Sequence, residues 1–132
     1  GKEIEVAVMG NESPVASVCG EIDSGAEFYD YETKYVTDTS RSYILARISE
    51  TAEEAVRDMA VRVYSALGCR GLSRVDFFVT PAQEIYLNEL NTMPGFTSIS
   101  MYPKLWQATG LSYGALLDRL IRLAMERAES NG

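Results

Sequence analysis

The stretch of sequence that decides the fold runs from Ser73 to Met101 and reads SRVDFFVTPAQEIYLNELNTMPGFTSISM. Residues 74–79 are mostly β-branched and aromatic, which is typical of a strand. Residues 80–83, TPAQ, have the composition of a turn. Residues 84–91 alternate like a second strand, one side of which carries Ile85, Leu87, Glu89 and Asn91. The stretch therefore predicts a β-hairpin that leads into a glycine-containing loop.

The polar residues of this hairpin meet if its strands pair in one particular register. We expect Val79 to lie opposite Glu84. Arg74 then faces Glu89, and Asp76 becomes a diagonal neighbour of Glu89, roughly 7–8 Å away at Cβ. One end of one face thus collects four polar side chains: Arg74, Asp76, Glu89 and Asn91. A register shifted by one residue would place the two acids on opposite faces.

Such a cluster suits a hard cation. Carboxylate and amide oxygens are the ligands of Mg²⁺, which usually takes one or two carboxylates plus substrate phosphates. Arg74 would stabilise anionic oxygens beside the metal. Gly95 would let backbone N–H groups approach a developing negative charge, as in an oxyanion hole. A plainer interpretation stays open, in which Arg74 and Glu89 form an ordinary cross-strand ion pair and Pro94-Gly95 is only a turn.

Composition places the chain among ordinary soluble globular domains. Its 132 residues suffice for one domain, and 46% of them are hydrophobic while 23% are charged. The net charge of −7 argues against a non-specific nucleic-acid-binding face, which would be basic. No apolar run approaches the ~18 residues of a membrane span, and no signal peptide is recognisable. We expect a cytoplasmic protein without a nucleic-acid or membrane partner.

Two residue types restrict the chemistry. The chain has no histidine, which excludes from it Ser-His-Asp and Cys-His nucleophile systems and histidine-ligated zinc sites. Cys19 and Cys69 form no C-x-x-C motif, and we interpret them as structural thiols in a reducing compartment. The chain begins at Gly1-Lys2, directly before a strand, and we interpret it as a piece of a longer protein.

Periodicity outside the hairpin predicts two more strands and three helices. Alternation indicates strands at residues 3–9 and 15–22, and amphipathic patterns indicate helices at residues 49–67, 102–109 and 112–129. The order ββ, loop, α, ββ, α, α predicts an α+β fold, mainly an antiparallel sheet with helices packed on one face.

The helices are expected to bury defined stripes. A capping box starting at Thr51 is expected near the beginning of the first helix. Its buried face is predicted to consist of Val56, Met59, Ala60, Val63 and Leu67. The buried face of the last helix is predicted to consist of Leu117, Leu120, Ile121 and Ala124.

Residues 23–43 have no sustained period but carry five aromatic residues, Phe28, Tyr29, Tyr31, Tyr35 and Tyr43. A segment of this length without secondary structure is uncommon inside a compact domain and is usually functional. A loop that folds over a flat ligand or over the domain and an ordinary surface loop pinned by tyrosines both fit these residues.

Three stretches resemble the D-alanine–D-alanine ligases of the ATP-grasp superfamily. They are FYDYETKY at residues 28–35, GLSRVDFF at residues 71–78 and LNELNTMPGFTSISMYPKL at residues 87–105. The last motif is long and specific, and the resemblance covers nearly the whole chain. It implies that residues 1–132 form the C-terminal ATP-grasp subdomain of a ligase whose N-terminal domain and glycine-rich phosphate loop lie outside this chain. Residues 23–43 would then be a long lid loop over the active site.

The resemblance implies roles for the predicted cluster. The positions that hold two Mg²⁺ ions, or Mn²⁺, on ATP are matched by Asp76, Glu89 and Asn91. Arg74 and the backbone of Gly95 match groups that stabilise the tetrahedral intermediate. Tyr35 matches a residue that closes over the first D-alanine.

Five further residues match binding positions of the family. On the nucleotide side, Glu3 matches an acid that bonds the ribose, Phe28 belongs to the adenine-side packing and Lys34 reaches the phosphates. On the substrate side, Ser100 and Met101 match the pair that receives the carboxylate of the second substrate. Glu3 carries the weakest of these matches, because a single acid in a strand is a common feature.

The implied activity is ATP-dependent ligation of two D-alanines through an acyl phosphate, for peptidoglycan precursor synthesis. The resemblance also implies a homodimer for the full-length protein. Relatives that join D-lactate carry a histidine-containing stretch in place of residues 32–35, and several D-lactate and D-serine users carry Arg in place of Met101. Both differences favour D-alanine as the second substrate, with D-serine as the alternative.

Two other function classes are alternatives. A non-catalytic ATP-grasp-like binding module would not need the complete set of charged positions. Another ATP-grasp carboxylate–amine ligase would keep the metal-binding acids but lack FYDYETKY and NTMPGFTS. We expect this chain alone to be inactive, because the resemblance places essential nucleotide-binding residues upstream of Glu3.

Overall fold

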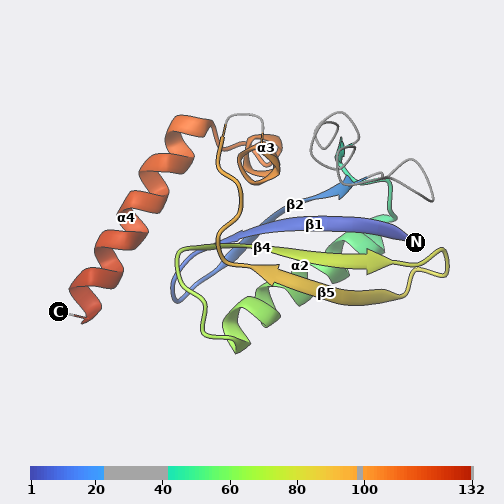
Figure 1. The fold of residues 1–132 in the computed structure, drawn as a ribbon, viewed down its shortest axis with the longest axis horizontal. Helices are drawn as coiled ribbons and strands as arrows, with labels where there is room; N and C mark the ends of the chain where they lie inside the picture. Colours follow the sequence, from blue (N-terminus) through green and yellow to red (C-terminus); the bar gives the residue numbers. More distant parts are fainter. Residues whose placement is uncertain (23–41, 98–99, 132) are drawn as a thin grey trace.

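The computed structural model describes residues 1–22, 42–97 and 100–131. In chain order the elements are β1 (Lys2–Met9), β2 (Val15–Ile22), β3 (Ser42–Ile44), α2 (Glu50–Ala66), β4 (Leu72–Val79), β5 (Ile85–Asn91), α3 (Met101–Ala108) and α4 (Tyr113–Asn131). The strands form one antiparallel sheet in the order β3-β2-β1-β4-β5 (Figure 1). This arrangement confirms the predicted α+β class. The expected lid loop lies outside the described residues.

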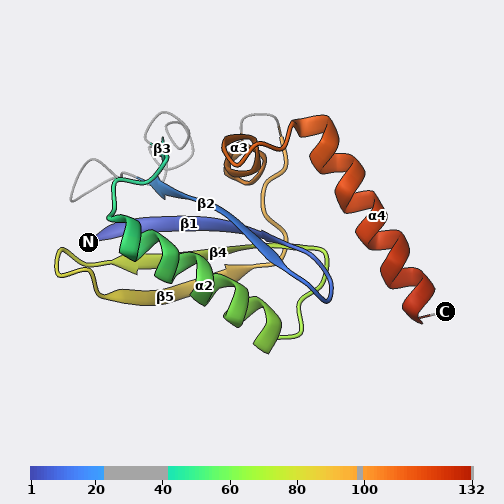
Figure 2. The same cartoon turned by 180° about the vertical axis from the view of Figure 1, so that it is seen from behind.

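Two hydrophobic clusters cover the two faces of the sheet. On one face α2 packs Val56, Ala60 and Tyr64 against alternate residues of β1 and β4, including Ile4 and Phe77. On the other face α3 packs against Ala7 and Met9 of β1. The prediction that the helices share one face is therefore wrong. Figures 1 and 2 show α2 lying across the strands on one side of the sheet and α3 next to β2. The physical reason is that both faces of β1 are apolar near its end.

The hairpin forms as predicted, but its register differs. Val79 pairs with Ile85 instead of Glu84, so the expected register is wrong by one residue at the turn. The register shifts again between Phe77, which pairs with Leu87, and Asp76, which pairs with Glu89. Asn88 is the additional residue of a β-bulge in β5. A uniform shift of one residue would have placed the two acids on opposite faces of the sheet. The bulge returns both acids to the same face.

The long helix α2 confirms the predicted element but corrects its cap. Ser49 is the N-cap, and its side-chain oxygen accepts a hydrogen bond from the backbone N–H of Ala52 at 3.1 Å. The capping box expected at Thr51 is wrong, because this residue already lies inside the helix. Ser49 acts as the cap because its short hydroxyl side chain, just before the first turn, accepts a hydrogen bond from a backbone N–H that has no partner within the helix.

The buried stripe of α2 also differs in part from the prediction. It consists of Ala52, Val56, Ala60 and Tyr64. Leu67, predicted to be buried, is 66% exposed because it follows the last turn. Tyr64 takes its place in the core, where its hydroxyl donates a 2.6 Å hydrogen bond to the Gly10 carbonyl.

The last helix diverges from the body of the domain (Figure 1). Near its start Leu116 is buried in the α3 cluster, with Leu120 and Leu123 packed against it. Leu117 and Ile121, predicted to be buried, are 40% and 60% exposed. The sequence pattern misplaced the stripe by one position, because leucines occur on both sides of it. Among the described residues, no helix is both long and apolar enough to cross a membrane.

Candidate active site

Three carboxylates lie in one row across the sheet. Asp76 of β4 has Glu5 of β1 as its Cα partner on one side and Glu89 of β5 on the other. Directly opposite residues share a face, so the three side chains project to the same side. Ile4 and Val6, which flank Glu5, pack with α2. The row therefore lies on the face that α2 leaves free.

Arg74 belongs to the same face, because it stands two residues from Asp76 on β4. Its Nε donates a hydrogen bond to Asp76 Oδ1 at 2.9 Å, and its Nη2 donates to Oδ2 at 3.0 Å. The same Nε lies 3.2 Å from Glu5 Oε1, although that oxygen has no hydrogen bond of proper geometry. The three side chains are 19%, 11% and 14% exposed. The guanidinium thus lies between two shielded carboxylates.

The row contains more negative charge than one guanidinium neutralises. Burial raises the pKa of Glu5 to about 7, with the charge of Arg74 opposing the rise and the neighbouring acids adding to it. Burial likewise raises the pKa of Asp76, against the hydrogen bonds and charge of Arg74, and Glu89 adds to that rise. A further cation on this face would stabilise the ionised carboxylates.

The donor set fits Mg²⁺. Asp76, Glu89 and Asn91 offer carboxylate and amide oxygens, and the register pairs Asn91 with Arg74 beside the row. In the part of the chain that the structure describes, no group of three or more acids and cysteines is arranged to enclose a metal ion. Two carboxylates with open positions are the usual protein share of a Mg²⁺ site, which leaves room for phosphate oxygens and water.

The loop after β5 brings two more of the predicted residues together. Its beginning is held by Asn91, whose Oδ1 accepts a 2.9 Å hydrogen bond from the Met93 N–H. At Gly95, a Cβ would lie 3.2 Å from Ser100 Oγ, so the two residues are in close contact. Ser100 Oγ also accepts a 3.0 Å hydrogen bond from the Thr97 N–H. Glycine at position 95 therefore keeps the backbone close to the hydroxyl.

Met101 lies on the same face as the carboxylate row. A Cβ at Gly20 would be 3.0 Å from Met101 Cε and 2.8 Å from Leu105 Cδ2, so the start of α3 rests directly on β2. Gly20 is the Cα partner of Glu5. The predicted substrate-side residue Met101 therefore lies on the face of the predicted metal ligands, but over β2, with β1 between it and Asp76.

The other predicted residues have separate locations. Glu3 is half-buried on the face of the row, two residues before Glu5, and pairs with Phe78 of β4. Phe78 and its own partner Tyr86 are both exposed, so an apolar surface adjoins Glu3. Phe28, Lys34 and Tyr35 lie outside the described residues.

Sequence reasoning missed Glu5 as a site residue. The alternation of the first strand already placed it on the side of Glu3, away from the apolar residues. The missing information was the pairing of β1 with β4, because only that pairing sets Glu5 opposite Asp76. An acid that alternates with core residues in a central strand is the signal that could have identified it.

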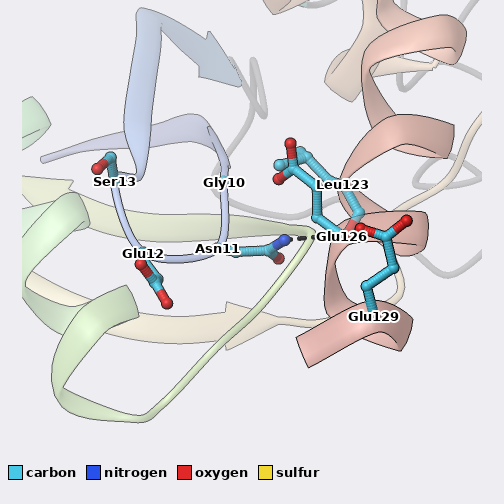
Figure 3. Close-up of a pocket in the computed structure, with 7 residues that line it drawn as sticks. All are labelled: Gly10, Asn11, Glu12, Ser13, Leu123, Glu126 and Glu129. Carbon is cyan, nitrogen blue, oxygen red and sulfur yellow. Dashed lines mark hydrogen bonds between the residues drawn. The ribbon is translucent and has the colours of Figure 1, made fainter. Parts of the chain in front are cut away.

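A cavity of about 600 Å³ lies elsewhere, between the β1–β2 turn and α4 (Figure 3). Its lining includes Asn11, whose Nδ2 donates a 2.9 Å hydrogen bond to the Leu123 carbonyl, and three glutamates, Glu12, Glu126 and Glu129. None of the predicted site residues contributes to it. The carboxylate row remains the better candidate site.

Comparison with known proteins decides the family. A family model described as "D-ala D-ala ligase C-terminus" matches residues 1–122. The chain belongs to this ligase family. A D-alanine–D-alanine ligase of Chlorobium limicola is 54% identical to it over 133 residues, which cover 100% of this chain and 37% of the relative.

Solved structures of the same family agree with the fold. The D-alanine-D-alanine ligase of Coxiella burnetii superimposes with a TM-score of 0.85 at 41% identity, covering 99% of this chain and 34% of that one. The VanG D-Ala:D-Ser ligase of Enterococcus faecalis gives 0.81 at 45% identity, covering 93% of this chain and 36% of that one. The chain thus has the ATP-grasp fold of these ligases and spans little more than a third of their length.

Proposed function

We propose that this chain is the C-terminal domain of an ATP-dependent ligase that joins two D-alanines into D-alanyl-D-alanine for peptidoglycan synthesis in the cytoplasm. The observation that carries the proposal is the convergence of Asp76 and Glu89 beside Arg74 on one face of the sheet, within a chain of this family. The clustering of charged groups supports a catalytic domain over a non-catalytic binding module, because such a module has no need of opposed carboxylates.

Asp76, Glu89 and Asn91 would hold Mg²⁺ at the phosphates of ATP. Bound there, Mg²⁺ neutralises charge on the phosphoryl group in transfer. A carboxylate oxygen of the first D-alanine takes the γ-phosphoryl group, which gives an acyl phosphate and ADP. The amine of the second D-alanine then forms the amide bond, loses a proton and expels inorganic phosphate.

Arg74 and the N–H of Gly95 would stabilise the oxyanion formed when the amine attacks. Donors aimed at that oxygen act strongly in a shielded site, and removing one costs ~10²–10³ in rate. The Arg74 side chain is only 19% exposed, which supports this role. Ser100 and Met101 would receive the carboxylate of the second substrate, and the packing of Met101 on Gly20, the Cα partner of Glu5, supports that assignment.

D-serine is the alternative second substrate. The VanG D-Ala:D-Ser ligase is among the similar structures, so the fold accommodates either amino acid. Met101 favours D-alanine, because its thioether packs on Gly20 and offers no charged or strongly hydrogen-bonding group to a serine hydroxyl.

The remainder of a full-length ligase would complete the site and cover part of this domain. On α4, Leu117, Ile121 and Met125 recur every four residues and are 40%, 60% and 60% exposed. Residues at this spacing form one apolar stripe along a helix. Because the relatives are nearly three times as long as this chain, we infer that their additional part packs on this stripe.

The test is phosphate release that depends on ATP and D-alanine, measured in a full-length ligase that carries this chain. Asp76→Ala and Glu89→Ala should each abolish turnover, whereas Glu54→Gln, an exposed site on α2, should leave it unchanged. Supplying D-serine as the second amino acid distinguishes the two substrates. Normal turnover by either alanine variant would contradict the metal assignment.

A further inference from the structure

Glu5 is the one carboxylate of the row to which the proposed function gives no role. It is also unusual in its bonding, because its Oε1 is buried and without a hydrogen bond. A buried acceptor without a partner lowers stability, so such an atom calls for a physical explanation. Arg74 Nε lies 3.2 Å from this oxygen, but it already donates a hydrogen bond to Asp76.

Asp76 lies at the centre of the row, where its carboxylate can bind either a cation or the Arg74 guanidinium. On the β5 side it faces Glu89, and together they offer oxygens to a cation. On the β1 side it faces Glu5, and Arg74 lies between these two acids. Arg74 donates hydrogen bonds to both carboxylate oxygens of Asp76.

A divalent cation on Asp76 would stand close to the guanidinium. Like charges this close repel strongly at the effective dielectric constant of a protein surface. The guanidinium must then shift away from Asp76 or the cation binds weakly. Glu5 is the acceptor already within reach, and it lies on the side of Asp76 away from Glu89.

We propose that Glu5 is a positioning residue that holds the Arg74 guanidinium when Asp76 binds a metal ion. Glu5 thereby keeps Arg74 on the face of the site, ready to stabilise an oxyanion, and frees the oxygens of Asp76. This inference rests on the proposed function for the role of Arg74. It adds a fourth side chain to the three metal-side residues, and that side chain acts through Arg74 without touching substrate.

The direct test observes the guanidinium itself. In the chain labelled with ¹⁵N-arginine, the Nε–Hε signal of Arg74 is assigned by its loss in Arg74→Lys. Hydrogen exchange of this signal is then measured by NMR with saturating Mg²⁺. We expect slow exchange in the unmodified chain and at least ~10-fold faster exchange in Glu5→Ala, because a hydrogen bond to a charged acceptor is lost.

Two variants control for other effects. Glu5→Gln keeps an acceptor oxygen and should give an intermediate exchange rate, whereas Glu54→Gln makes the same chemical change on the exposed face of α2 and should have no effect. A purely structural role for Glu5 would lower stability without changing the Arg74 signal. Equal exchange rates in the unmodified chain and Glu5→Ala overturn the proposal.

Kinetics of a full-length ligase give the second readout. Glu5→Ala should lower kcat at least ~10-fold with the KM for ATP unchanged, since it misplaces a transition-state group, and Glu5→Gln should recover most of the loss. An unchanged kcat in Glu5→Ala contradicts the positioning role. If the proposed function itself is wrong, a full-length ligase that carries Asp76→Ala will turn over normally. That result distinguishes failure of the proposed function from failure of the positioning role.

Discussion

At the scale of single residues, the clearest energetic feature is the charge balance around Arg74. Its neighbours Glu5 and Asp76 both have raised pKa values because burial disfavours their charged forms. Burial of like charges costs stability, so this cluster is poorly explained by folding alone. Its position on the open face of the sheet instead suits the binding of a cation and a phosphate-bearing substrate.

Gly20 provides a prediction about packing. Gly20→Ala would bring a Cβ to 2.8 Å from Leu105 and 3.0 Å from Met101, so α3 must shift. We expect a loss of ~1–3 kcal/mol in the free energy of unfolding, typical of overpacking. Urea denaturation measures this change in the free energy of unfolding.

The matched control is Gly114→Ala, where an added Cβ meets nothing within 4 Å. Alanine there should raise helix stability by roughly 0.5–1 kcal/mol. If Gly20→Ala were as stable as the unmodified chain, the close contact between β2 and α3 would be wrong.

The two cysteines should differ in reactivity. Burial raises the pKa of Cys19 to about 12, with the Glu53 carboxylate adding to the rise, so at pH 8 its thiol stays protonated in the folded chain. Cys69 is only half-buried. Iodoacetamide should therefore label Cys69 first, since the thiolate is the reactive form. Peptide mass spectrometry after partial labelling checks this, and Cys19 carrying the first label would refute it.

At the scale of elements, the bulge in β5 is the feature on which the site depends. If Asn88 were not bulged out of the ladder, Asn88 and not Glu89 would face Asp76, because Leu87 faces Phe77. Deleting Asn88 should leave a regular ladder in which Glu89 follows Leu87 and still faces Asp76, so a full-length ligase should keep much of its turnover, unlike Glu89→Ala.

Asn88→Ala is the control for that deletion, because it keeps the length of the strand. Its side chain is exposed, and it should retain at least half of the activity. A loss of turnover in the deletion variant as complete as in Glu89→Ala would contradict the assignment of Asn88 as the bulged residue.

The cap of α2 offers an independent check at this scale. Ser49→Ala should lower the free energy of unfolding by ~1 kcal/mol, because the Ala52 N–H loses its acceptor. Thr51→Ala, at an exposed position inside the helix, should change it little. Thermal denaturation of both variants measures the difference. An equal loss in both would contradict the assignment of Ser49 as the cap.

Local sequence periodicity predicted most of the helices and strands, but not the register and pairing of the strands. The strand at Val15–Ile22 and the approximate ends of α2 and α3 followed from alternation and helix period. The register of the hairpin was wrong, because pattern alone does not reveal a bulge at Asn88. Glu5 was missed for a similar reason, since its neighbour on β4 is 71 positions away in the chain.

At the scale of the whole molecule, the buried and exposed leucines of α4 could not be separated from its sequence. Leu116 is buried while Leu117 is exposed, and only the position of α3 decides between them. The prediction assumed that the helix packs along its whole length. In the structure Leu120 and Leu123 face the α3 cluster, whereas Ile121 and Met125 stay exposed.

This exposed stripe predicts that the chain in isolation self-associates. An apolar surface left uncovered favours contact between copies. Sedimentation should show a concentration-dependent rise in mean mass, which Ile121→Lys combined with Met125→Lys abolishes. Ala115→Lys, an exposed position near the start of α4, serves as the control and should leave the association unchanged. A monomer at all concentrations would contradict the stripe as a contact surface.

Binding of Mn²⁺ as a substitute for Mg²⁺, followed by electron paramagnetic resonance, tests the central assignment most directly. The chain should bind Mn²⁺, and Asp76→Asn or Glu89→Gln should each weaken binding at least ~10-fold, because each removes a charged oxygen ligand. Glu84→Gln, which alters an exposed acid just before β5, should leave the affinity unchanged. Equal affinity in all four proteins would contradict the metal site on this sheet.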